Sequence, residues 1–86
     1  MVTKQIKITG SFDDIAFCDW IMHRSNVLGL DISSLIHGQS SITFSASGHS
    51  ILLDAMEIAC SLGPLEAMVE QIHTNDLEPE QTIHSD

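Results

Sequence analysis

The sequence TKQIKITGSFDDIAF, residues 3–17, contains the change of hydrophobic period that decides the fold. In its first half Ile6 and Ile8 alternate with polar side chains, which is the period of a strand that packs on one face only. Gly10 ends this alternation. The stretch therefore predicts a strand over residues 3–9, followed by a different element.

Two helices are predicted from apolar residues that recur at near-helical spacing. The first covers residues 17–28 and stops naturally at Gly29. Its unpaired amide hydrogens at the start can be accepted by Asp13 or Asp14. The second covers residues 50–62 and carries a broad apolar stripe. We expect both helices to contribute to the core.

Three further strands complete the pattern. Residues 31–37 and 41–47 are predicted as two short strands around a turn, and residues 67–73 as a fourth strand. The second helix is broken before this last strand by Gly63-Pro64, because proline cannot continue the hydrogen-bonding ladder. The order β-α-β-β-α-β predicts an α+β, ferredoxin-like sandwich, an antiparallel sheet with two helices on one face.

The C-terminal residues 74–86 are polar and acidic and contain Pro79, so this segment is predicted as a short edge strand or a disordered tail. We expect one domain over residues 1–75 and an acidic tail over residues 76–86. A chain of 86 residues with 43% hydrophobic residues is sufficient for one modest core.

Charge is the distinctive feature of the composition. Twelve Asp and Glu residues outnumber three basic residues, Lys4, Lys7 and Arg24, and the formal net charge is −9. Nucleic acids and anionic membranes both require clustered Lys or Arg, so neither is expected as a partner. Such acidity is typical of a surface kept soluble by self-repulsion, and it also suits docking to a basic protein or mimicry of a nucleic acid.

The chain is expected to be cytoplasmic, without a membrane segment, cofactor or metal. Its apolar runs are far shorter than the roughly 20 residues that span a bilayer, and no signal-like apolar run precedes the first strand. Cys18 and Cys60 lack CxxC spacing, so both are expected as reduced thiols. The five histidines show neither HxxxH nor HxH spacing, although His37 and His49 could meet across the hairpin.

Residues 10–18, GSFDDIAFC, resemble the signature of the acylphosphatase family. That signature runs Gly, any residue, Val, Gln, Gly, Val, any residue, Phe or Tyr, and then Arg. The frame is kept by the first glycine, two apolar residues and the aromatic residue, which are Gly10, Phe12, Ile15 and Phe17. Weaker similarities in later segments extend the resemblance over roughly residues 5–74.

The resemblance implies a phosphate site that this chain does not complete. In the family, backbone amides of the loop after the first strand cradle a phosphate, an Arg at the end of the loop holds it, and an Asn late in the second strand positions the attacking water. Matched residue by residue, the Arg position is Cys18 and the Asn position is Ile36. Cys18 cannot hold a phosphate as Arg does, and Ile36 cannot position a water molecule as Asn does. The loop corresponds to Ser11, Phe12, Asp13, Asp14, Ile15, Ala16 and Phe17.

The loop also differs from the family in charge, because the family's Gln and Gly are here Asp13 and Asp14. Two carboxylates would repel a phosphate dianion, and they can satisfy the loop amides themselves. We therefore expect a self-capped loop that is closed to phosphate. Cys18 is expected to be a quiet thiol, because Asp13, Asp14 and Asp19 all disfavour its thiolate.

These features favour an acylphosphatase-like protein without the family's catalytic groups, used as a non-catalytic binding or regulatory module. One alternative is a hydrolase of carboxyl-phosphate bonds with a non-standard site, for which Arg24 is a poor replacement. Another is an acidic decoy that binds a basic protein surface. The chain is expected to be a monomer or a weak dimer formed through a sheet edge.

Overall fold

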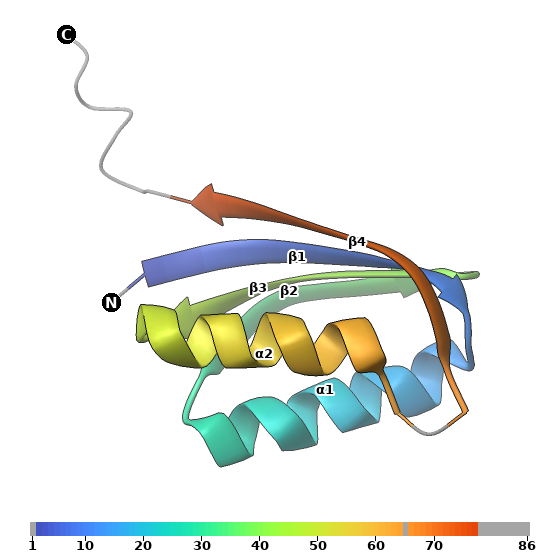
Figure 1. The fold of residues 1–86 in the computed structure, drawn as a ribbon, viewed down its shortest axis with the longest axis horizontal. Helices are drawn as coiled ribbons and strands as arrows, with labels where there is room; N and C mark the ends of the chain where they lie inside the picture. Colours follow the sequence, from blue (N-terminus) through green and yellow to red (C-terminus); the bar gives the residue numbers. More distant parts are fainter. Residues whose placement is uncertain (1, 65, 78–86) are drawn as a thin grey trace, which may run out of the picture.

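Two helices cover one face of a four-stranded antiparallel sheet in the computed structural model, which describes residues 2–64 and 66–77 (Figure 1). In chain order the elements are β1 (Val2–Ser11), α1 (Asp14–Leu28), β2 (Asp31–Gly38), β3 (Ser41–Gly48), α2 (Ser50–Leu62) and β4 (Met68–Leu77). The predicted ferredoxin-like fold is thus confirmed. Neither helix in the described part of the chain has the length and apolar character needed to cross a membrane.

The strand order is β2-β3-β1-β4, so β1 and β3 are the two interior strands. Their apolar side chains form the buried face of the sheet. Ile6 pairs with Phe44 and Ile8 pairs with Ile42, and all four side chains are fully buried on the helix side. Burial of each such side chain contributes about 1.5–3 kcal/mol to folding. The polar residues between them lie on the opposite face of the sheet.

Helix α1 begins at Asp14, three residues before the predicted start at residue 17. The carboxylate of Asp13 caps the first turn and allows this earlier start. The helical repeat of apolar residues begins only at Phe17, which is the first buried residue of the helix. At the other end Gly29 has φ of 72°, the left-handed conformation expected of a C-terminal glycine stop.

Helix α2 buries the stripe that the sequence predicted, and its fully enclosed side chains are Leu53, Met56 and Cys60. Burial raises the pKa of the Cys60 thiol to about 12, so this cysteine is a core residue. The helix is also tied to the sheet by Lys4 of β1. Its Nζ lies 3.2 Å from Asp54 and 3.6 Å from Glu57, and the hydrogen bond from Lys4 to Asp54 raises the pKa of this lysine.

Strand β4 is longer than predicted. The sequence predicted a strand over residues 67–73, whereas β4 continues to Leu77, which pairs with Thr3. The apolar alternation of the sequence fades after Ile72, but a ladder is formed by backbone groups and continues for as long as β1 offers a partner. The boundary predicted at residue 75 falls inside this strand, and residues 78–86 of the predicted tail lie outside the described residues.

Gly10 lies at a bulge between β1 and β4. Thr9 pairs with Gln71 and Gly10 pairs with Val69, so β4 has one extra residue at this point. A Cβ atom at Gly10 would lie 2.1 Å from the carbonyl oxygen of Met68. The glycine is therefore required by the close approach of the two backbones.

We expect Gly10→Ala to lower the free energy of unfolding by about 1–3 kcal/mol, because the backbone of β4 must move to admit the methyl group. Urea denaturation measures this change. Gly38→Ala is the matched control, since its Cβ would meet only the Ser41 Oγ at 3.8 Å, and it should change stability by less than about 0.5 kcal/mol. Equal losses in the two variants would contradict the close approach.

Candidate functional site

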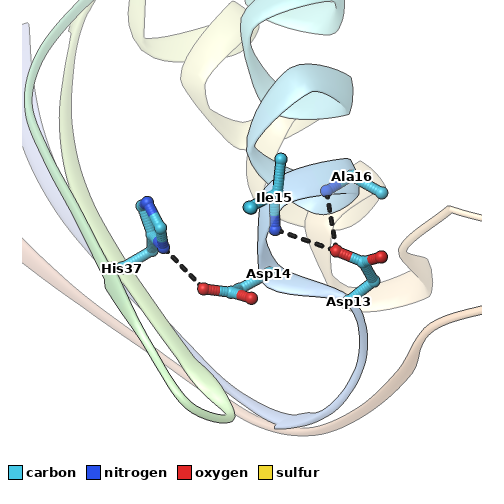
Figure 2. A network of polar contacts seen from close by, with 5 residues as sticks. All are labelled: Asp13, Asp14, Ile15, Ala16 and His37. Carbon is cyan, nitrogen blue, oxygen red and sulfur yellow. Dashed lines mark hydrogen bonds and ion pairs between the residues drawn. The ribbon is translucent and has the colours of Figure 1, made fainter.

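Phe12 and Asp13 join β1 to α1, and the loop that the resemblance identifies, residues 11–17, also includes the end of β1 and the first turn of α1. The backbone of Asp13 is extended, with φ of −77° and ψ of 109°, as is usual for an N-cap residue. Its Oδ1 accepts hydrogen bonds from the amides of Ile15 and Ala16, each at 3.1 Å (Figure 2). The capping predicted from the sequence is therefore present, and Asp13 rather than Asp14 provides it.

Asp14 turns instead towards the β2–β3 hairpin. Its Oδ2 lies 2.5 Å from Nδ1 of His37 on β2 (Figure 2). This hydrogen bond lowers the pKa of Asp14 below its ordinary value and outweighs partial desolvation, which acts in the opposite direction. The pair ties the start of α1 to the hairpin, so the two acidic side chains of the loop have separate partners.

A bulge in β2 brings His37 to this position. The register shifts between Ser33 and Ile36, and Ser34 has a positive φ of 55°. Beyond the shift Ile36 pairs with Thr43, on the face away from the helices, and is 67% exposed. His37 pairs with the buried Ile42 and so lies on the helix face. Ile36 therefore points away from the loop, and the residue that reaches the loop from β2 is His37.

His49 lies far from His37. His37 is near the hairpin turn, whereas His49 follows Gly48 at the opposite end of β3. The meeting of these two histidines that the sequence left open does not occur, because they flank the full length of a strand. Within residues 2–64 and 66–77, no group of three or more His, Cys, Asp or Glu side chains could hold a metal ion.

Cys18, at the position where the resemblance places an arginine, is a buried free thiol that is 8% exposed. Desolvation raises its pKa, and the negative charges of Asp14 and Asp19 raise it further. This environment supports the quiet thiol predicted from the sequence, and its low reactivity stays a prediction. Arg24 is the single arginine of the sequence, and its guanidinium carbon lies 5.3 Å from the centre of the Trp20 ring.

The remaining loop residues divide into apolar anchors and exposed positions. Phe17 is fully buried, and Phe12 packs against it edge to face at 4.8 Å between ring centres. Ser11 and Ala16 are exposed, and Ile15 is 64% exposed. The two aromatic rings therefore hold the loop on the core, while its polar groups face outwards.

A cavity of about 350 Å³ lies beside the loop, between it and the α2–β4 turn. The walls combine aromatic, small apolar and acidic side chains, chiefly Phe12, Phe17, Pro64, Ala67, Asp13 and Glu66. The sequence did not reveal this cavity, because its second wall comes from a turn about 50 residues away along the chain. Asp13 and Glu66 thus line a space large enough for a ligand group.

The fold is similar to those of known acylphosphatases. The acylphosphatase from Bacillus subtilis superimposes with a TM-score of 0.80 at 15% identity, over 90% of this chain and 86% of that one. The acylphosphatase from Coxiella burnetii gives 0.77 at 16% identity, over 90% and 81%. The C-terminal domain of the MgtC protein from Mycobacterium tuberculosis gives 0.65 at 16% identity, over 91% and 89%. No family model and no curated protein matches the sequence. At these identities the comparisons show an acylphosphatase-like fold.

The contact between Asp14 and His37 makes folding stability depend on pH. The lowered pKa of Asp14 means that the pair contributes fully above the ordinary value of 3.8 and is lost as the pH falls through the folded-state pKa. We expect His37→Gln to raise the Asp14 pKa towards that ordinary value, as measured by NMR titration of its carboxyl carbon. His73→Gln is the control, since His73 pairs with Lys7 on the opposite face of the sheet. An Asp14 pKa unchanged by His37→Gln would show that the contact is not formed in solution.

Proposed function

We propose that this protein is an acylphosphatase-like domain that does not hydrolyse acyl phosphates and acts in the cytoplasm as a non-catalytic binding or regulatory module. The single observation that carries the proposal is the capping of the Ile15 and Ala16 amides by Asp13. These are amides of the loop that, by resemblance, would cradle a phosphate. A carboxylate already bonded to these two amides competes with a phosphate for them and places a negative charge beside it.

The other groups that acyl phosphate hydrolysis needs are also missing from the loop. Cys18 offers a buried neutral thiol where a guanidinium would hold the phosphate. Ile36 points to the far face of the sheet, and an aliphatic side chain could not orient a water molecule in any case. His37, which does reach the loop, is engaged by the carboxylate of Asp14. These contacts support a closed site over an active one.

A hydrolase with a non-standard site is the less favoured alternative. It would need a cation near the loop, and Arg24 lies over Trp20 instead. The partner class that the charge supports best is a basic protein, since twelve acidic residues stand against three basic ones. Of those three, Lys4 already pairs with Asp54 and Glu57. This imbalance favours association with a cationic surface, weakened by salt.

We expect inorganic phosphate to cause no saturable amide shifts at residues 11–18 in ¹H–¹⁵N NMR spectra of the wild-type protein, because Asp13 occupies the Ile15 and Ala16 amides and repels the anion. In the D13A/D14N variant two amides are freed and two negative charges removed, so phosphate should bind more tightly than to the wild type. D31N/D76N removes the same charge far from the loop and should not gain affinity. Submillimolar phosphate binding to the wild-type loop would contradict the proposal.

Hydrolysis of benzoyl phosphate tests the alternative in the same preparations. The proposal expects turnover no faster than the spontaneous rate. Turnover well above that rate, together with its disappearance in Arg24→Ala, would establish the non-standard hydrolase instead.

A further inference from the structure

We infer that the cavity between the β1–α1 loop and the α2–β4 turn receives a lysine or arginine side chain of a basic partner protein. This inference rests on the proposed function and gives the binding module a defined site. It reverses the charge preference expected of this loop, which by resemblance would take an anion.

The shape of the cavity suits one long side chain. Its volume of about 350 Å³ is near the lower end of the roughly 300–1,000 Å³ of ligand sites. The half-buried ring of Phe12 forms one apolar wall. The fully buried Phe17 holds this ring in place from the core side, with ring centres 4.8 Å apart and planes inclined at 72°. Pro64 and Ala67 contribute apolar surface from the other side. Such walls fit the methylene stem of a basic side chain, which packs on apolar surface while its head remains at polar groups.

The charge of the cavity suits the head group. Asp13 uses Oδ1 for both amide bonds, and Figure 2 shows its second oxygen turned away from those amides. Glu66 supplies a carboxylate from the α2–β4 turn. A cation in this cavity is attracted by both carboxylates, and the half-buried ring of Phe12 can add a cation–π contact.

The basic residues of the chain itself do not fill this role. Lys4 pairs with Asp54 and Glu57 beneath α2, and Arg24 lies over Trp20. Lys7 projects from the opposite face of the sheet, between Thr43 and His73. Among the described residues, neither Asp13 nor Glu66 forms an ion pair. The cation must therefore come from another molecule.

The other ligand classes fit less well. An anion would face both carboxylates, and a neutral apolar group would cover them without pairing their charges. A basic side chain presented by a protein satisfies the apolar walls and the carboxylates together. The net charge of −9 would further attract the cationic surface that carries it.

The test is an ¹H–¹⁵N NMR titration with the blocked peptides acetyl-Gly-Arg-Gly-amide and acetyl-Gly-Lys-Gly-amide, with acetyl-Gly-Gln-Gly-amide as the uncharged control. We expect saturable shifts confined to residues 12–17 and 66–67 for the two basic peptides only, reduced in 0.5 M NaCl. The D13N/E66Q variant should bind about fivefold to tenfold more weakly, since exposed ion pairs contribute modestly each. Asparagine also caps helices, so this variant keeps the start of α1.

D31N/D76N is the charge-matched control, because it takes the net charge from −9 to −7 as D13N/E66Q does, and it should bind like the wild type. Shifts spread evenly over the acidic surface, or equal in the two variants, would overturn the cavity assignment and leave the proposed binding module standing. Absence of shifts at residues 12–17, or equal shifts with the glutamine peptide, would also overturn it. Phosphate binding at the wild-type loop would instead overturn the proposed function itself.

Discussion

The hydrogen bonds from the Ile15 and Ala16 amides to Asp13 Oδ1 determine the chemistry of the loop around them. A helix N-terminus offers unpaired donors and partial positive charge, which is what attracts an external anion. Here the chain supplies the anion from its own side chain. The same two bonds allow α1 to begin at Asp14 and satisfy the Ile15 and Ala16 amides. The carboxylate that accepts them places a negative charge next to the cavity.

The second carboxylate of the loop depends on the backbone of another strand. Because Ser34 takes a left-handed conformation, two residues of β2 stand opposite Phe44. Leu35 can then remain packed against the core while His37 returns to the helix face and reaches Asp14. Without the extra residue the alternation would place His37 on the outer face. Bulges are common at sheet edges, and this one, on the edge strand β2, also aims a side chain at the loop.

The sequence was sufficient to predict the fold and the capped start of α1, but not the contact that His37 makes with the loop. The alternating burial of β1 and the glycine stop at Gly29 are local signals, and both predictions are confirmed. The sequence narrowed the cap to Asp13 or Asp14 because capping acts within three residues, and the structure selects Asp13. His37 was missed because a bulge at Ser34 changes the face of every later residue of β2, and nothing in a gapless comparison reveals it. The length of β4 was missed because pairing with β1 outweighs its weak apolar pattern.

The residues that anchor the loop on the core differ from those that carry its charge. An acylphosphatase-like fold can therefore accommodate a loop that is negatively charged. The loop is anchored by Phe17, which is fully buried, and by the ring of Phe12 against it. Asp13 is exposed, so a change of its charge is screened by water and costs the core little. Cys18 is buried beside Phe17, and there a neutral thiol avoids the desolvation that a buried guanidinium would incur. Stability therefore requires no ligand at this loop, and Asp13, Asp14 and Cys18 can define its chemistry independently of the fold.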